Sequence, residues 1–479
     1  MLTIEEIGRI VSDDASNETK KAAKVGRRYY EGDHDILGYK LFYYDADGVL
    51  VEDKARSNIK IPHPFFTELV DQCVQYMTSG DGPIVRAKDD NNAELQTALD
   101  KYFGDEFMAE LSETLTDACS CGFGYMHGAL GSDLRTHFTS AEALGVVEVR
   151  AKDVDANAEH YVYWYVDRID RGRKKIKRIQ VWDEQEVSYY VKADNGQIAV
   201  DKDEPLNPRP HIVYKKGDER FGKGYGFIPF FRLDANQRRT SHLKPVKRLI
   251  DDYDLMSCGL SNNVQDVSEA IYVVKGFDGE NLDEMIQNLR TKKSVKVDSD
   301  GGVELLTTDI PYDARMKKLE VDEKNIYRFG MGLNASQVGD GNVTNVVIKS
   351  RYALLDMKCN KLETRLKAFM RKLVGIALEE INASGEKERG YTLSDVDIRF
   401  EREVMTNAKD NAEISLLEAQ TKQAEVGTLL NAASVYGDES VLNSVCELLG
   451  LEPDEVRGSM PEEENGGLDG AVAALTGVE

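Results

Sequence analysis

The chain is short of positive charge and of long apolar runs. Its 479 residues include 61 Lys and Arg against 85 Asp and Glu, a formal net charge of −24. This balance excludes a simple basic domain that is held on nucleic acid by counterion release. No segment approaches the ~18 uninterrupted apolar residues of a membrane-spanning helix, and the N-terminus is acidic where a signal peptide would be basic and then apolar. We therefore expect a soluble protein that has no membrane partner and stays where it is made.

Cysteine is also scarce. The six cysteines are spread over the whole chain, which excludes a disulfide-dense scaffold. The one close pair, Cys119 and Cys121 followed by His127, lacks the C-x-x-C spacing and the second pair of a structural zinc site. The sequence thus predicts a reducing compartment and cysteines that act as small buried hydrophobes.

The motifs of common enzymes are missing as well. The sequence has no G-x-x-x-x-G-K-[ST] phosphate loop, no H-E-x-x-H and no G-x-S-x-G, and its seven His residues are dispersed. Asp251 and Asp254 would be neighbours on a helix, but acidic residues at this spacing are more typical of a solvated helix face than of a metal site. We expect no enzymatic activity, no cofactor and no bound metal. A metal-dependent DNA-processing enzyme that uses Asp251 and Asp254 is kept as an alternative.

The residues that are abundant predict a folded α+β protein. Hydrophobic residues make up 41% of the chain, with 22 Tyr and 15 Phe, and the length suggests roughly three folding units. Apolar residues at helical spacing predict one helix over residues 1 to about 30, one that ends at Gly80, and one over about 100–127. Pro62 and Pro64 predict extended backbone just before the helix that ends at Gly80. Between 146 and 200, β-branched and aromatic runs separated by polar turns predict an antiparallel meander with one wet face.

Long helices dominate the second half. A helix that begins near Ser241 and a second from about Asp313 to Gly330 flank a small αβ insert with strands and a helix of its own. After a loop rich in Gly and Asn, a four-three spacing from about Asn345 to Asn382 predicts a helix of roughly 38 residues, ~57 Å long. A rod of this length must cross domains or pack against copies of itself. A strand over Asp397–Glu401 is expected to return to the sheet.

A cluster of basic residues stands out on the predicted long helix. Between residues 349 and 372 it carries eight Lys and Arg against two acidic residues. Three interpretations remain open for this basic strip: a solvated face, a contact with an acidic neighbouring subunit, or a surface that faces DNA. The residues singled out in it are Lys349, Arg351, Lys358, Lys361 and Arg365.

The order of these segments resembles the portal proteins of tailed bacteriophages, of the type found in siphophages of Gram-positive hosts. The resemblance rests on short motifs in a fixed order between about residues 20 and 450, and no single motif is specific. They are Tyr29-Tyr-Glu-Gly-Asp33, Asn58-Ile-Lys-Ile-Pro62, Gly226-Phe-Ile-Pro229 before Leu249-Ile-Asp-Asp-Tyr-Asp254, Ser268 to Gly276, and Leu306 to Pro311.

The resemblance implies a multidomain portal-like fold with long α-helices (stem and wing spine), an antiparallel β wing, a small αβ clip and a helical crown. The implied divisions run in chain order. They are N-terminal helices and wing over 1–240 (β-rich at 146–215), stem helices over 241–267 and 313–333, a clip over 268–312, a tunnel loop over 334–345, the wing spine and returning strand over 346–407, a crown over 408–450 and a disordered acidic tail over 451–479.

The resemblance also implies partners and functional residues. The partners would be other copies of the chain in a ring of twelve, double-stranded DNA in its channel, the terminase large subunit, a head-tail adaptor, and scaffold and major capsid proteins. The protein would be part of the virion, at a capsid vertex, after assembly in the host cytoplasm. The implied tunnel-loop residues are Asn334, Ser336, Gln337, Asp340, Asn342, Val343, Thr344 and Asn345, and the implied clip residues that dock motor or adaptor are Tyr272, Lys275, Glu284, Asn288, Lys292, Lys293 and Lys296.

The expected tunnel loop departs from a DNA-gripping loop in one respect. No Lys or Arg occurs between Gly330 and Val347, so a tight grip on phosphate is not expected. A weak hold suits a conduit, because every neutralised phosphate adds affinity that would impede sliding. A non-annular capsid protein remains a second alternative to the ring.

Overall fold

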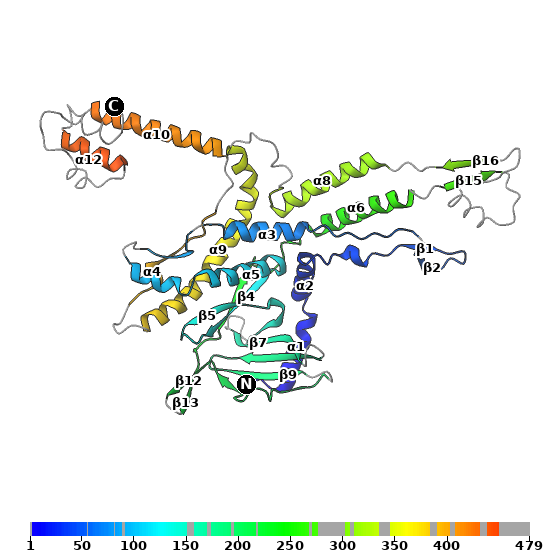
Figure 1. Cartoon of the computed structure of the whole chain (residues 1–479). Coiled ribbons are helices and arrows are strands. Elements are labelled where there is room, and N and C mark those ends of the chain that lie inside the picture. The colour runs from blue at the N-terminus through cyan, green and yellow to red at the C-terminus, as the bar shows by residue number, and fades with distance from the viewer. Residues whose placement is uncertain are drawn as a thin grey trace. The chain divides into compact units, whose positions relative to one another are not determined.

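A computed structural model describes most of the chain, which divides into two compact units. The described residues are 2–54, 56–80, 82–88, 92–150, 158–169, 174–192, 196–216, 219–267, 271–275, 302–306, 311–334, 345–383, 390–402, 408–431 and 438–449. Unit 1 contains residues 1–337 and 352–403, and unit 2 contains 338–351 and 404–479. The described residues form both helices and strands (Figure 1), which is consistent with the predicted α+β class.

The N-terminal segment forms two helices, where the sequence analysis predicted one. Helix α1 (Ile4–Ser16) begins with a capping box in which the Thr3 and Glu6 side chains bond each other's backbone N–H. Asn17 is extended and its side chain accepts a hydrogen bond from the N–H of Thr19, so it caps helix α2 (Glu18–Tyr30). The single-helix prediction is wrong because Asn at this position favours a cap over a helix interior.

Three further helices complete the first part of unit 1. They are α3 (Phe65–Met77), α4 (Ala93–Asp100) and α5 (Asp105–Cys121). Helix α5 ends at Gly122, which is left-handed (φ 96°) and whose added Cβ would lie 2.4 Å from the Arg239 carbonyl oxygen. Only glycine fits there, so the chain turns at this point into strand β4.

The predicted meander is confirmed as a six-stranded antiparallel sheet. Its order is β10 (Ile198–Val200), β9 (Glu186–Lys192), β8 (Lys174–Trp182), β7 (Ala158–Ile169) and β6 (Val146–Arg150), with β11 (Arg209–Pro210) also on β9. A three-stranded sheet beside it has the order β14 (Phe230–Asp234), β4 (Phe123–Leu130) and β5 (Thr136–Ala141).

Both faces of the larger sheet are covered, so the prediction of one wet face is wrong. On one face Val162 and Ile179 pack with Ile7 and Val11 of α1. On the other face a second set of side chains packs against the three-stranded sheet. That set contains Val146, Trp182, Val187 and Tyr189, which cluster with Phe123, Tyr125 and Phe230. Alternate residues of each strand therefore serve two cores.

The described residues also form four two-stranded ladders outside these two sheets. They are β1 (Phe42–Tyr44) with β2 (Leu50–Glu52), β12 (Ile212–Lys216) with β13 (Glu219–Lys223), β15 (Ile271–Lys275) with β16 (Gly302–Leu306), and β17 (Val396–Ile398) with β3 (Val85–Ala87). The strand expected to return to the large sheet is thus β17. It pairs Ile398 with Val85 in a separate ladder because buried partners are available there.

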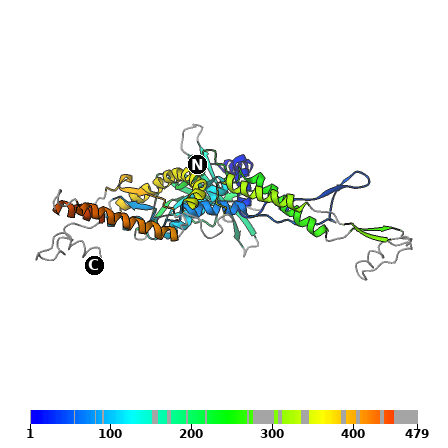
Figure 2. The same cartoon turned by 90° about the horizontal axis from the view of Figure 1, so that it is seen from above.

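Two helices of unit 1 run side by side after the sheets (Figures 1 and 2). An ion pair between Lys318 and Asp252, at 2.5 Å, joins helix α8 (Tyr312–Gly330) to helix α6 (Lys247–Val267). Lys318 also pairs with Asp322 of its own helix. Helix α6 begins six residues later than predicted, because turns occupy residues 242–246, where Pro245 lacks an N–H.

The predicted long helix is confirmed as α9 (Asn345–Ala383), 39 residues. In unit 1 its buried seam contains Leu355, Leu362, Leu366 and Phe369. In unit 2, α10 (Ala408–Asn431) and α12 (Asp438–Leu449) pack through Val426, Val441 and Val445. The helix expected over 282–289, the strand expected over 294–298 and the acidic tail lie outside the described residues.

The N-terminal helices are anchored by a buried ion pair that can be tested. The Lys20 Nζ donates to Asp14 at 2.5 Å and to the carbonyls of Leu144 and Val146 at 3.0 and 2.8 Å. We expect Asp14→Ala to lower the free energy of unfolding by about 3 kcal/mol, since it leaves a buried cation without its partner. Chemical denaturation measures this. The matched control Glu18→Ala removes the exposed pair with Lys21 and should cost less than about 0.5 kcal/mol; equal losses would contradict the role given to Asp14.

Candidate functional site

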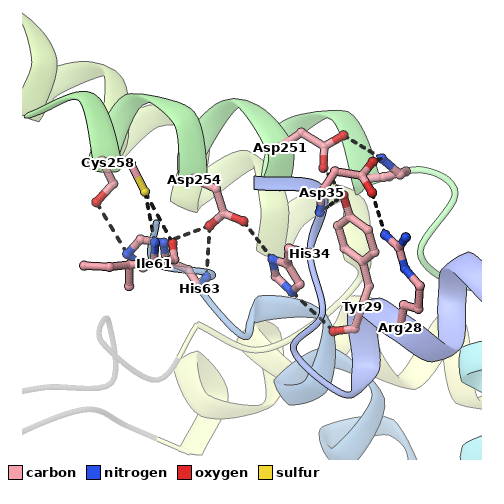
Figure 3. Close-up of polar contacts among 11 residues, drawn as sticks. Arg28, Tyr29, His34, Asp35, Ile61, His63, Asp251, Asp254 and Cys258 are labelled. Carbon is pink, nitrogen blue, oxygen red and sulfur yellow. Dashed lines mark hydrogen bonds and ion pairs between the residues drawn. The ribbon is translucent and has the colours of Figure 1, made fainter. Parts of the chain in front are cut away.

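An extended segment docks on helix α6 through a ladder of three backbone donors. The N–H groups of Ile59, Ile61 and His63 donate to side chains of Asn262, Cys258 and Asp254 at 2.7, 3.2 and 2.9 Å. Figure 3 shows the Ile61 and His63 steps of this ladder. Every second residue of an extended chain advances about 6.6 Å, and every fourth residue of a helix about 6.0 Å, so the two repeats match when they run antiparallel.

Two prolines fit the same ladder. Pro62 and Pro64 lie at positions that alternate with the donors Ile61 and His63, so the N–H that proline lacks is not needed for a bond to α6. The Cδ of each proline clashes with helical backbone in the residue before it, which favours extended backbone there. The prediction that this segment is extended and leads into α3 is therefore confirmed, and the spacing of its prolines has a structural reason.

Asp254 is the centre of the site. Its side chain is 0% exposed and accepts hydrogen bonds from His34 Nδ1 at 2.7 Å and from His63 Nδ1 at 2.8 Å (Figure 3). Burial alone raises the pKa of Asp254, but these bonds outweigh it and hold the pKa below its ordinary value. The carboxylate thus joins the end of α2 and the 59–63 segment to α6.

Asp251 is engaged one turn earlier. It accepts from the Tyr29 hydroxyl and from Lys247 Nζ at 2.8 Å, and Lys247 also contacts Asp35 at 2.6 Å (Figure 3). Asp251 and Asp254 therefore bond different groups of the same chain and share no ligand. The expectation of a solvated face is wrong for Asp254, which is buried, and the geometry gives no support to a metal site at this pair.

A second set of contacts holds the end of α8 against α3, just before the predicted tunnel loop. The Gln72 amide donates to the Leu333 carbonyl at 2.8 Å and accepts from the Leu333 N–H at 2.9 Å, as a strand neighbour would. Tyr327 donates to Glu68 at 2.5 Å, and Asn334 donates to Glu323 at 2.9 Å. The lead-in to residues 335–344 is thereby held on packed helices.

Lys358 belongs to this buried hub, and not to an outward basic strip. Its Nζ donates to the carbonyls of Leu69 and Gly330 at 3.3 and 3.1 Å, and the residue is only 9% exposed. The expectation that Lys358 meets DNA or a neighbouring subunit is therefore wrong, because its amine is hydrogen-bonded to carbonyls within the chain. Lys349 and Lys361 are exposed, and Arg351 and Arg365 are half-buried.

Few of the other predicted site residues fall on described structure. Of the tunnel loop, Asn334 follows α8 and Asn345 is the first residue of α9; Ser336, Gln337, Asp340, Asn342, Val343 and Thr344 lie outside the described residues. Of the clip, Tyr272 and Lys275 are on β15, opposite Leu305 and Gly302 of β16. Glu284, Asn288, Lys292, Lys293 and Lys296 lie outside the described residues.

The sequence analysis missed His34 and His63 as partners of Asp254. Both were counted among dispersed histidines, because they are 29 positions apart and far from α6 in the chain. The available signal was their position: His34 directly follows the Tyr29–Asp33 motif, and His63 directly follows the Asn58–Pro62 motif. Short motifs that end at a titratable residue are candidates for a common site.

Comparisons with known proteins now assign the chain. Residues 11–439 match the family model described as "Phage portal protein, SPP1 Gp6-like". The portal protein of Bacillus phage SPP1 is 27% identical over 407 residues, which is 83% of this chain and 79% of the relative. The portal protein of Clostridium phage phiCD119 is 24% identical over 440 residues, 86% of this chain and 89% of the relative.

The matched range covers most of the chain, so the chain belongs to the SPP1-type family of phage portal proteins and has a phage portal function. A chain in the solved structure described as "Neck of empty GTA particle computed with C6 symmetry" aligns with a TM-score of 0.42 and 13% identity, over 82% of this chain and 91% of that one. At this TM-score the likeness adds no argument.

The central carboxylate gives a direct stability test. We expect Asp254→Ala to lower the free energy of unfolding by about 3 kcal/mol, since it leaves the buried Nδ1 of His34 and the half-buried donors of His63 unpaired. The control Asp252→Ala removes a half-exposed ion pair and should cost about 1 kcal/mol or less. Urea denaturation of both variants measures the difference, and equal losses would count against the central role of Asp254.

The same carboxylate predicts a pH dependence. The folded pKa of Asp254 lies below its unfolded value of about 3.9. Its contribution is therefore complete above pH ~4 and is lost as the pH falls through the folded pKa. Stability measured from pH 6 downward should fall more steeply in the wild type than in Asp254→Ala below pH ~4; parallel curves would show that this carboxylate is not responsible.

The packing of α8 against α3 can be tested by adding one methyl group. A Cβ at Gly330 would lie 2.6 Å from Leu69 Cδ1 in the core, and a Cβ at Gly375 of α9 would meet nothing within 4 Å. We expect Gly330→Ala to cost about 1–3 kcal/mol through overpacking, and Gly375→Ala to gain up to about 1 kcal/mol from helix propensity. Thermal unfolding checks the opposite signs; a shift of the same sign in both variants would contradict the close approach.

Proposed function

We propose that this chain assembles into a closed ring at one capsid vertex and that double-stranded DNA is packaged and ejected through the central channel. Twelve copies are the proposed number. The proposed partners are the terminase large subunit during packaging and a head-tail adaptor afterwards, with scaffold and major capsid proteins during assembly in the host cytoplasm. The role is mechanical, and the chain carries out no catalysis of its own.

The main support for the ring is an arm, residues 39–52, whose apolar surface is exposed. In its strands β1 and β2, Tyr44 is 73% and Leu50 54% exposed, and the two residues lie opposite each other. Phe42 and Tyr43 are exposed as well, so both faces of this two-stranded ribbon are apolar. An isolated hairpin is marginal in water, and a neighbouring copy of the chain would supply the missing contacts.

The α6–α8 pair supports the same assembly. Its helices also carry exposed large apolar side chains away from their mutual contact. They are Leu255 and Val264 on α6, and Val321 and Phe329 on α8. Repeated around an axis, such surfaces would bury one another between adjacent copies, while Asp251 and Asp252 stay bonded to Lys247 and Lys318.

Weak attraction to DNA supports the conduit. The chain has a formal charge of −24, and no Lys or Arg occurs between Gly330 and Val347. An acidic, polar channel wall repels the duplex toward the axis, and a segment without cations adds no salt-dependent grip. The proposed clip over 268–312, with Tyr272 and Lys275 on its ladder, would meet motor and adaptor; for the exposed strip residues Lys349 and Lys361, a neighbouring subunit and DNA both remain candidates.

The arm provides the test of the ring. Mass photometry of the purified chain should show particles near twelve times 53.6 kDa, about 643 kDa. The double variant Tyr44→Ser, Leu50→Ser should weaken subunit association at least tenfold, because it removes a pair of apolar contacts worth about 1.4 kcal/mol or more. The control Leu134→Asn changes a residue that is 74% exposed outside the arm and should leave the ring intact. A wild-type monomer, or an open assembly of undefined mass, would overturn the proposal.

The proposed tunnel loop has a separate test. Deletion of residues 334–345 with a short Gly-Ser bridge should leave the ring mass unchanged and stop DNA packaging in an in vitro packaging assay. A bridge of twelve Gly and Ser residues in the same place separates loss of length from loss of the native side chains. Normal packaging by the deletion variant would refute a function for this loop without affecting the ring.

A further inference from the structure

Three buried cysteines from three different helices gather beside one histidine. Cys73 is on α3, Cys119 on α5 and Cys359 on α9, and His242 lies in the turn before α6. The ligand atoms of Cys73, Cys119 and His242 all lie within 4.8 Å of one another. The portal function derived above uses none of these side chains.

The spacing of the sulfur atoms fits a shared metal ion. The Sγ atoms of Cys73 and Cys359 are 3.7 Å apart. In a tetrahedral zinc site with Zn–S bonds of about 2.3 Å, two sulfur atoms lie about 3.8 Å apart. A disulfide needs about 2.05 Å between the same atoms and an oxidant to form it, so the distance favours ligands of one ion over a bonded pair.

The surroundings of the cluster also suit a metal. The backbone N–H of His242 donates to the Cys119 carbonyl at 3.0 Å, which fixes the imidazole next to the thiols. Its ring Nδ1 is buried and has no hydrogen-bond partner among the residues that the structure describes. A buried ring nitrogen without a partner is costly, and coordination of a metal ion by the ring is one way to remove that cost.

Charge and access complete the site. Zinc with three thiolates and one neutral imidazole carries a net charge of −1. Lys358, the residue before Cys359, lies buried in the hub, and no carboxylate pairs with its Nζ in the part of the chain that the structure describes. His242 and Lys358 both line a cavity of about 530 Å³, which gives an ion a route to the cluster.

We propose that Cys73, Cys119 and His242, whose ligand atoms form one group, bind a zinc ion. Cys359, which contacts Cys73 but lies outside this group, would move in as the fourth ligand. Thiolate and imidazole ligands in a tetrahedral set select Zn²⁺ over Mg²⁺ or Ca²⁺, which prefer oxygen. The ion would join α3, α5, α9 and the turn before α6 at one point. It is a structural site, because four protein ligands leave no position for a substrate.

Metal content and a cobalt spectrum test the proposal. The full-length ring is purified from zinc-supplemented cells without chelator, and zinc is counted by mass spectrometry. Chelator-treated protein then receives Co²⁺ alone, whose visible absorption and thiolate charge-transfer bands report tetrahedral sulfur ligation. We expect about one zinc per subunit and both sets of bands, with Co²⁺ displaced by added Zn²⁺.

Two ligand variants and one control keep the test independent of folding. His242→Gln changes a half-buried side chain and Cys119→Ser a fully buried one; each should lower zinc affinity at least tenfold in a competition with a fluorescent chelator. Cys121→Ser, two residues beyond Cys119 in a separate buried cluster, should bind zinc as the wild type does.

Circular dichroism and ring mass confirm that each variant is folded. Folded wild type without zinc or cobalt bands, a Cys73–Cys359 disulfide detected by mass, or equal loss in Cys121→Ser would overturn the site.

Discussion

The match between an extended chain and a helix at Asp254 is the constraint on which the rest of unit 1 depends. Three alternate N–H groups reach three side chains that are spaced one helical turn apart on α6, and the innermost acceptor is a fully buried carboxylate. A buried carboxylate is tolerated only when its oxygens are bonded. The requirement to satisfy Asp254 therefore fixes at once the end of α2, the entry to α3 and the register of α6.

From α3 the same constraint reaches the end of α8. The Gln72 side chain bonds both the N–H and the carbonyl of Leu333, as a neighbouring β-strand would. Lys358 of α9 donates to the carbonyls of Leu69 on α3 and Gly330 on α8. These contacts hold the residues that precede segment 335–344 on packed helices with little freedom to move. In the proposed channel, this anchor would hold the start of the loop in place against force from a moving duplex.

The sequence predicted those parts of the fold that depend on local periodicity. The meander, the 39-residue helix α9 and the extended Pro62–Pro64 segment all follow from spacings within one element. The errors concern what each element packs against. One face of the meander was expected to be wet because α1 and the β4 sheet are distant in sequence, and Lys358 was grouped with exposed cations because burial of its amine depends on carbonyls of α3 and α8. The Asp254 site was missed for the same reason, since its histidines come from two loops.

Pairing of carboxylates within the chain along α6 would reduce the repulsion between copies in the proposed ring. Asp251 is bonded to Lys247, Asp252 to Lys318 and Asp254 to two histidines. Lys247 and Lys318 each pair with a second carboxylate, Asp35 and Asp322, so these bonds reduce the negative charge of the α6–α8 pair without cancelling it. In a ring every surface charge recurs at each interface, so repulsion from one unpaired carboxylate would be repeated at every subunit contact. In the proposed ring, pairing these groups within the chain would let the exposed apolar side chains of α6 and α8 set the contact.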